Sequence, residues 1–406
     1  MTATDTPRST SAATVRAGVS ERPSASLFAR GRALRPSGKV LPEHARTHNR
    51  ALVLQTLYGA GPLSRADIAR QTGLTRVTVS ELVAELMTER LVIDRGQREG
   101  VRPGKPATLL DVDRGSFHVI SVDLSETGIV RGAVHDLDDG ILARAQHTTG
   151  PTTGDALVDE VLTLVGEMLD LATAPVLGIG VGSPGVVDRA GVVLSAPNLG
   201  WTDLPLQRLI ADRFRVPVHV ANDANVAVLA EHAAQHTSSD LLLVRVGLGV
   251  GAGLIIAGHP VVGGAFAAGE IGHVVVGTDE GPLCACGRHG CLEAWLAAPR
   301  LAAEIDRLAS SVGIDRARDE VLREAGRRLG IVLAPVVGAL NLSDVVVSGP
   351  TELLAGAFLD ATIETLRQRT MADFNRDLTL RMTSHGQDIV LRGAAVMVLS
   401  GQLGVS

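Results

Sequence analysis

All three cysteines of this 406-residue chain lie within eight residues, in the string Cys284-Ala-Cys286-Gly-Arg-His-Gly-Cys291. Because they are so close together, they cannot form the dispersed disulfide framework of a secreted domain, and the chain must fold around a local knuckle. Three thiolates with glycines between them suit tetrahedral zinc, which needs one further ligand. His273 is the better candidate, since His289 lies inside the knuckle, where the chain geometry makes ligation harder. Four protein ligands leave no open position, so we expect structural zinc; three reduced cysteines in a tight loop are the alternative.

Length and composition predict two or three domains with cores of small aliphatic side chains. At about 100–200 residues per domain, 406 residues suffice for two or three units. Aromatic residues make up 2% of the chain while glycine contributes 45 residues, so Ala, Val, Leu and Ile must fill the cores between many tight turns. No apolar run is long enough to span a bilayer, and the N-terminus lacks the apolar core of a signal peptide. We therefore expect a cytoplasmic protein without a membrane partner.

The charge of the chain is unevenly distributed. Residues 1–110 contain 17 Lys and Arg against 9 Asp and Glu, a charge of +8, so the remaining residues carry −14 to give −6 overall. A basic N-terminal part on an acidic body indicates contact with nucleic acid or another polyanion at one end only. Residues 1–45 are rich in Ser, Thr, Ala, Pro and Arg without a sustained period, which predicts a disordered basic arm. A basic tail without a partner would give the same composition.

Residues 46–112 have the pattern of a small DNA-binding domain. An apolar stripe predicts a first helix, Ser64 and Gly73 bound a short second helix, and Thr75 caps a third. Two strand candidates follow, at 91–93 and 107–112, with a loop rich in Gly, Arg and Pro between them. Three helices and two strands around a basic loop are typical of a winged helix-turn-helix domain.

The polar side chains of this domain predict its contacts with double-stranded operator DNA. Four of them crowd the start of the third helix, the end that meets base edges in the major groove: Thr75, Arg76, Thr78 and Ser80. In the loop, Arg102 and Lys105 would reach phosphates or the adjacent minor groove. A three-helix bundle without DNA contact is the alternative. Because one such domain buries little surface, we expect a homodimer or homotetramer on a palindromic site.

From residue 115 to residue 406 the pattern is that of an α/β domain. Apolar, strand-like runs alternate with helical patterns, as at 155–172 and 292–309. The strand candidates lie at 118–124, 176–182, 217–221, 241–247 and 344–348. Glycine-rich turns follow several of them, as expected where loops at the ends of strands approach a ligand.

Polar residues near the strand ends and the knuckle predict a sugar site. Asn222 and Asp223 stand side by side just after a strand candidate, Glu270 precedes His273 by three residues, and Glu293 follows the last cysteine by two. Amide, carboxylate and imidazole groups are those that hydrogen-bond vicinal hydroxyls, so together they suit a sugar. Taken singly, each is more often a helix cap or a solvated loop residue.

These motifs resemble the ROK family of sugar kinases and repressors, over everything except the first 45 or so residues. The most specific part is Gly269-Glu-Ile-Gly-His273, followed by a Cys-x-Cys-Gly-x-x-Gly-Cys-x-Glu string that ends at Glu293. Ala196-Pro-Asn198-Leu-Gly-Trp201 and Asn222-Asp223 agree as well, and the N-terminal domain matches the winged helix of the repressor branch. The resemblance implies an actin-like (ribonuclease-H-like) α/β fold, with two lobes around a sugar-binding cleft.

The resemblance also assigns residues to that cleft. Sugar hydroxyls would be bound by Asn198, Asn222, Asp223, Glu270, His273 and Glu293. Zinc would lie on His273, Cys284, Cys286 and Cys291. In family kinases, the aspartate at the position of Asp223 is the base that activates the accepting hydroxyl.

The chain departs from the family kinases where ATP phosphates would bind. Those kinases carry Asp-x-Gly-Gly-Thr in the first strand-turn, whereas this chain reads Asp123-Leu-Ser-Glu126-Thr, so two side chains replace bare glycine backbone. The Gly-Thr-Gly of the second phosphate loop is Gly247-Leu-Gly249 here, which removes a hydroxyl donor. We expect the Glu126 carboxylate to face the phosphate charge, with no lysine nearby to offset it.

These observations favour a sugar-responsive transcriptional regulator, specifically a repressor of carbohydrate metabolism genes, over an enzyme. Sugar binding in the body would shift the affinity for DNA through the two lobes. Two alternatives stay open: an ATP-dependent ROK sugar kinase that carries a DNA-binding domain, and a regulator whose body serves only dimerisation. Sugar-dependent phosphorylation by ATP distinguishes the first alternative, and a sugar-induced thermal shift distinguishes the second.

Overall fold

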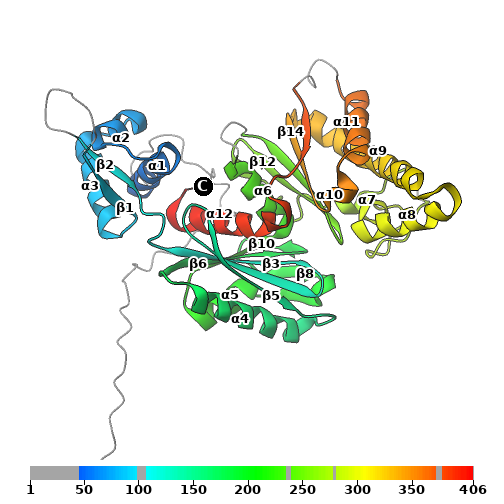
Figure 1. Ribbon diagram of the computed structural model, residues 1–406, viewed down its shortest axis with the longest axis horizontal. Helices are drawn as coiled ribbons and strands as arrows, with labels where there is room; N and C mark the ends of the chain where they lie inside the picture. Colours follow the sequence, from blue (N-terminus) through cyan, green and yellow to red (C-terminus); the bar gives the residue numbers. More distant parts are fainter. Residues whose placement is uncertain (1–44, 98–106, 235–238, 278–279, 372–376, 406) are drawn as a thin grey trace, which may run out of the picture.

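Two five-stranded mixed sheets with the same strand order form the body of the protein (Figure 1). The computed structural model describes residues 45–97, 107–234, 239–277, 280–371 and 377–405. The first sheet has the order β10 (Val218–Asn222), β6 (Val176–Ser183), β3 (His118–Glu126), β4 (Ile129–His135) and β5 (Ile141–Thr148). The second has the order β15 (Thr379–Met382), β14 (Asp344–Ser348), β11 (Leu241–Val246), β12 (Val250–Ile256) and β13 (His259–Pro260). In each sheet an antiparallel meander of three strands is extended by two parallel strands beside its first strand.

Helices cover both faces of the first sheet. α4 (Gly154–Leu171) and α5 (Leu206–Phe214) lie on one face, and α12 (Ile389–Leu403) lies on the other (Figure 1). α6 (Asp223–Ala234) starts where β10 ends and packs between α12 and the second sheet. The core of the first sheet is shared by a small sheet of β7 (Val186–Val187), β8 (Val193–Ala196) and β9 (Trp201–Leu204). We call these elements, without α6, the first lobe.

The second lobe consists of the second sheet and the helices on its far face. These are α7 (Leu292–Leu296), α8 (Ala298–Val312), α9 (Ile314–Leu340), α10 (Thr351–Leu354) and α11 (Ala357–Arg369). The helix expected at 292–309 is divided, because Pro299 in the first turn of α8 cannot continue the helix before it. The strands expected in the body and the helix at 155–172 are confirmed to within two residues at each end, whereas the strand expected at 91–93 extends to Gln97. Among the described helices, none is long and apolar enough to cross a membrane.

The central strands β3 and β11 send alternate residues to opposite faces, and one or two polar side chains of each lie on the face toward α6. In β3, Ile120, Val122 and Leu124 enter the core beneath α4, so Asp123 and Ser125 point to the opposite face. In β11, alternate residues from Leu242 to Val246 enter the core of the second lobe. Arg245 therefore shares the other face with Leu241 and Leu243, which pack against α6.

The N-terminal unit comprises α1 (Ala45–Ala60), α2 (Arg65–Thr72), α3 (Arg76–Thr88) and the antiparallel strands β1 (Val92–Gln97) and β2 (Thr108–Val112). Its helices end where the sequence predicts. Ser64 and Asp67 form a reciprocal capping box at α2, Gly73 closes that helix with φ of 69°, and Thr75 caps α3.

The C-terminal helix joins the N-terminal unit to the body. Apolar residues of α12, among them Val398, Leu399 and Leu403, complete the core formed by α1, α2, α3, β1 and β2 (Figure 1). The expected arm at 1–45, apart from Ala45 itself, and the loop residues Arg102 and Lys105 lie outside the described residues.

Candidate functional site

A cavity of about 210 Å³ lies between the two lobes. The first lobe supplies the end of β3 and the segments near β7 and η2 (Pro197–Leu199), and the second lobe supplies the β11–β12 turn and the knuckle. All six residues expected to bind sugar line this cavity: Asn198, Asn222, Asp223, Glu270, His273 and Glu293. We call these six residues the acceptor side. They come from segments up to 95 residues apart, so only the tertiary fold brings them together.

Asn222 and Asp223 lie at the junction of β10 and α6, where strand becomes helix. The Asn222 Oδ1 accepts hydrogen bonds from the N–H groups of Ala224 and Asn225 at 3.0 and 3.1 Å, and so caps α6. Its Nδ2 donates to the carbonyl of Gly185 at 2.9 Å, which leaves one amide hydrogen for a ligand. The helix start in turn places the buried Asp223 carboxylate at the wall of the cavity.

The Asp223 carboxylate is paired with a cation that sequence reasoning missed. Arg245 donates from Nη1 to Asp223 Oδ2 at 2.7 Å and from Nη2 to Ser125 Oγ at 2.7 Å. Burial raises the pKa of Asp223, the Arg245 charge opposes that rise, and the nearby Asp123 adds to it. A signal was available, because Arg245 is the one charged residue in the otherwise apolar run 241–247.

Glu270 is positioned by two glycines that pack tightly against β12. Gly269 has φ of 94°, and a Cβ there would lie 1.9 Å from the carbonyl oxygen of Ala252. A Cβ on Gly272 would lie 2.1 Å from the carbonyl oxygen of Val250. Both positions therefore exclude any side chain, which explains the Gly-Glu-x-Gly-His spacing. Burial raises the pKa of Glu270, a rise that His273 opposes and that Asp223 and Glu293 increase.

Glu293 connects the knuckle to the β11–β12 turn. It is the second residue of α7, a helix that begins directly after the last cysteine. Its Oε2 accepts a hydrogen bond from the Val250 N–H at 3.1 Å, and its Oε1 accepts one from Cys284 Sγ at 3.6 Å. This carboxylate thus holds two cavity walls at a fixed separation while still facing the cavity.

The knuckle is a tight turn that places three sulfur atoms and one imidazole together. Within it, Cys284 N–H donates to Arg288 O at 2.8 Å and Gly287 N–H donates back to Cys284 O at 2.9 Å. Cys286 Sγ and Cys291 Sγ are 3.6 Å apart, and Cys284 Sγ lies 3.6 Å from His273 Nδ1. One ligand atom from each of these four residues lies within 4.8 Å of all the others.

These distances match a tetrahedral metal site. With Zn–S bonds of about 2.3 Å, the sulfur atoms of a tetrahedron are separated by about 3.8 Å. His289 lies outside the cluster, because its Nδ1 is within 3.0 Å of the Gly281 carbonyl oxygen. A hydrogen bond from the Arg288 backbone is the main cause that lowers the pKa of Cys286 to about 7, whereas burial raises the pKa of Cys284 and of Cys291. The four residues expected to hold zinc could therefore hold a metal ion.

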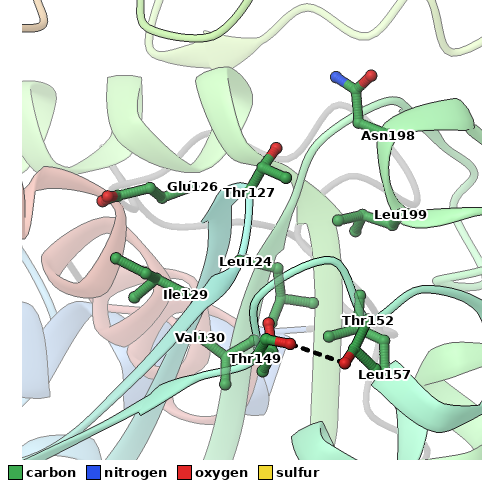
Figure 2. Close-up of a pocket in the computed structure, with 11 residues that line it drawn as sticks. Leu124, Glu126, Thr127, Ile129, Val130, Thr149, Thr152, Leu157, Asn198 and Leu199 are labelled. Atoms are coloured by element: carbon green, nitrogen blue, oxygen red, sulfur yellow. Dashed lines mark hydrogen bonds between the residues drawn. The ribbon is translucent and has the colours of Figure 1, made fainter.

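The donor side, residues 123–127 and 247–249, differs from the expectation at Glu126. The Glu126 carboxylate pairs with Arg131 on β4, and its side chain lines a neighbouring space of about 10 Å³ (Figure 2). The expectation that it faces a phosphate position is wrong, because Arg131 offers a direct opposite charge across the β3–β4 hairpin. Ser125 N–H donates to Asp123 Oδ1 at 2.9 Å, and Gly247 N–H donates to Gly249 O at 2.9 Å.

The exposed face of α3 carries the residues expected to contact DNA. Thr75, Arg76 and Ser80 are exposed and Thr78 is half-buried. Thr78 N–H donates to Thr75 Oγ1 at 3.1 Å, and Ser80 Oγ donates to Arg76 O at 2.8 Å, so both hydroxyls also support the helix. Sequence reasoning missed Val77, which is 69% exposed although the other valines of α3 are fully buried. It lies off the apolar stripe of this helix, and that was the available signal.

Repeated sheets with a polar cavity between them define a mixed α/β protein of the sugar-kinase-like fold. The chain belongs to the ROK family, whose model matches residues 119–400. That match covers the body and most of α12.

Individual relatives extend the similarity to the N-terminal unit. The chain is 28% identical over 385 residues to the xylose repressor of Caldicellulosiruptor bescii, covering 87% of this chain and 96% of that one. A solved ROK family transcriptional regulator, described as a homologue of the E. coli Mlc protein, has a TM-score of 0.78 at 22% identity and covers 89% of this chain and 98% of its own. A ROK family glucokinase from Streptomyces griseus, solved with glucose and AMPPNP, has a TM-score of 0.60 at 26% identity. The match covers 68% of this chain and 98% of the glucokinase chain.

Proposed function

We propose that this protein is a sugar-responsive transcriptional repressor that binds operator DNA through its N-terminal unit and a sugar in the cavity between its lobes. The observation that carries the proposal is the contrast within that cavity. Six polar side chains from both lobes line one space, while one N–H group in each donor loop, that of Ser125 and that of Gly247, is already bonded within the chain. The relatives that match along most of this chain's length include the xylose repressor, whereas the glucokinase lacks a counterpart to about a third of it.

The acceptor side is suited to an uncharged polyol. Asp223, Glu270 and Glu293 supply carboxylate oxygens that accept hydrogen bonds from hydroxyl groups, and Asn198 and Asn222 supply amides that both donate and accept. Three acidic groups around one small space disfavour an anionic ligand. The body is assigned to the actin-like class, since both sheets repeat one strand order around this cavity.

A zinc ion on His273, Cys284, Cys286 and Cys291 would stabilise the wall that carries Glu293. Ligation of His273 through Nδ1, the atom nearest Cys284, leaves the Nε2–H free to donate toward the cavity. The four protein ligands make such a site structural, because no position stays open for a substrate.

The N-terminal unit is a winged helix-turn-helix domain in this proposal, with α3 as the recognition helix. The exposed start of α3, with Arg76 at its first position, is the end of such a helix that reaches base edges. Among the described residues, no carboxylate pairs with Arg76, so its guanidinium is available to a guanine. Binding as a symmetric homodimer or homotetramer would place two such helices on a palindromic operator. Because the operator is DNA, the proposal also places the protein in the cytoplasm.

The coupling between sugar and DNA runs through α6 and α12. α6 begins at Asp223 in the cavity wall, and its turn at Val226 touches α12 so closely that a Cβ on Gly393 would lie 1.9 Å from the Val226 carbonyl oxygen. The other end of α12 lies in the core of the N-terminal unit. A movement of α6 on sugar binding would therefore shift α12 within the core that it shares with the N-terminal unit, because close-packed helices move together.

The test is release of operator DNA by a panel of sugars, with ADP formation measured in parallel. Genomic fragments retained by the purified protein would supply a labelled operator, and each sugar would be added with and without ATP and magnesium. At least one neutral sugar should lower operator affinity by about 5- to 150-fold, the usual range of allosteric coupling, without forming ADP. Sugar-dependent ADP formation would replace the proposal with a kinase, and retention of no DNA fragment would remove it.

A further inference from the structure

Arg245 lines the cavity but is neither one of the six acceptor-side residues nor one of the residues expected to contact DNA. It is a strand residue of the second lobe, yet both of its hydrogen-bonded side-chain partners, Asp223 and Ser125, belong to or adjoin the first lobe. Its side chain is only 21% exposed, and that of Asp223 is 12% exposed. A charge placed within an apolar strand loses hydration, so this arginine persists only because its partners are well placed.

The Arg245 guanidinium contacts both Ser125 and Asp223, and we call these three residues the cavity floor. It bonds the end of β3 through Ser125 and the start of α6 through Asp223. It also lies over the second donor loop, since a Cβ on Gly247 would be 3.8 Å from its Nη1. Two fixed N–H donors on one planar group can hold these partners in a single arrangement, which a flexible ammonium does less well.

Both oxygens of the Asp223 carboxylate are oriented by this arrangement. Oδ1 accepts the Ala224 N–H at 2.8 Å and Oδ2 accepts Arg245 Nη1 at 2.7 Å. Each oxygen keeps a further lone pair, so the carboxylate can still accept a hydrogen bond from a ligand hydroxyl. Without the arginine it would be buried near Asp123 and Glu270 with no opposite charge of comparable proximity.

We infer that Arg245 is a positioning residue for the sugar effector, which orients the Asp223 carboxylate and ties the second lobe to the end of β3 across the cavity floor. The inference rests on the proposed sugar site and deepens it. The effector then binds to side chains that are already ordered. Its binding free energy is therefore not reduced by the entropic cost of ordering them.

Two substitutions separate the two roles of Arg245. Arg245→Met removes both contacts and should lower sugar affinity by about 10- to 100-fold, because Asp223 loses its charged partner. Ser125→Ala removes only the tie to the first lobe and should lower affinity by about 2- to 5-fold. In the double variant the Ser125→Ala effect should vanish, since the arginine that makes that bond is gone. Arg245→Lys restores the charge without the two-pronged geometry and should recover part of the affinity.

Arg114→Met is the matched control. Arg114 is 27% exposed, pairs with Asp138 at 2.9 Å and with Asp111 at 3.0 Å, and does not line the cavity. It should leave sugar affinity unchanged within about twofold, the scatter of independent sites. Melting temperatures without sugar would be measured for every variant, and if Arg245→Met does not fold, Arg245→Gln, which also removes the charge, replaces it in the cycle.

The measurement is calorimetric or fluorescence titration of full-length protein with the sugar that releases the operator. If no sugar in the panel binds the unmodified protein, the proposed function fails before the variants are compared. If the unmodified protein binds and Arg245→Met binds equally or more tightly, the inference alone is overturned. Additive effects of Ser125→Ala and Arg245→Met would also overturn it.

Discussion

The acceptor side and the donor side face the same cavity but use their polar groups differently. On the acceptor side, Asp223 and Glu270 keep lone pairs directed at the open space. On the donor side, the N–H groups of Ser125 and Gly247 are consumed by Asp123 and by Gly249. Recognition of hydroxyls needs only the first set, whereas phosphoryl transfer needs fixed N–H groups and cations around the phosphate. A cleft can therefore keep its ligand and lose the reaction.

The knuckle carries two residues of the acceptor side, since His273 would share its metal and Glu293 follows its last cysteine by two residues, so removal of that metal should have the largest effect. Cys286→Ser should lose zinc and, with it, the sugar-dependent release of operator, since the wall carrying Glu293 is no longer held. Metal content would be measured by elemental analysis of freshly purified protein, with about one zinc per chain expected for the unmodified chain. His289→Gln, in the same turn but directed at Gly281, should keep both zinc and response. Zinc retained in Cys286→Ser would contradict the ligand set.

Loss of a single acceptor should have the next largest effect. Asp223→Asn or Glu270→Gln should weaken sugar binding by about 10- to 100-fold, the cost of a hydrogen bond to a charged group. Titration of the purified protein with the releasing sugar gives the affinity. Asp212→Asn, on the exposed surface of α5, serves as the control and should bind normally. Unchanged sugar binding in both acceptor variants would show that the acceptor side is not the recognition surface.

The sequence predicts local features of this molecule better than long-range ones. Ser64, Gly73 and Thr75 cap helices as expected, because capping depends on a few neighbouring residues. The grouping of His273 with the cysteines was also predicted, because three cysteines need a fourth ligand from outside the knuckle and His273 is the nearby candidate. The predicted direction of the Glu126 side chain was wrong, and the role of Arg245 was missed, because both side chains depend on partners in other strands or helices. Spacing along the chain carries no information about such pairs.

DNA recognition should be separable from both sides of the cavity. Arg76→Ala should weaken operator binding by about 1–3 kcal/mol and relax the sequence preference if the guanidinium pairs with a guanine. Sugar affinity should stay the same, because α3 is separated from the cavity by α12 and the core of the N-terminal unit. Gel-shift titrations on operator and mutated operator would measure both quantities. Arg208→Ala, on the exposed surface of α5, is the control, and equal operator binding by both variants would contradict the assignment of α3.

Changes at Glu126 and Leu248, two donor-side residues that do not hydrogen-bond Arg245, should have the smallest effect, and they test the comparison most directly. Glu126→Gly combined with Leu248→Thr restores a glycine and a hydroxyl that family kinases carry at these positions. Sugar affinity should change by less than about twofold, since neither Glu126 nor Leu248 belongs to the acceptor side that hydrogen-bonds the sugar hydroxyls. No ADP should form, because Ser125 and Arg245 still occupy the cavity floor next to Asp223. A coupled ADP assay with ATP, magnesium and the releasing sugar would measure turnover. Sugar-dependent turnover in this double variant would mean that the two sides differ by only two residues, and that the arginine does not keep a phosphate from Asp223.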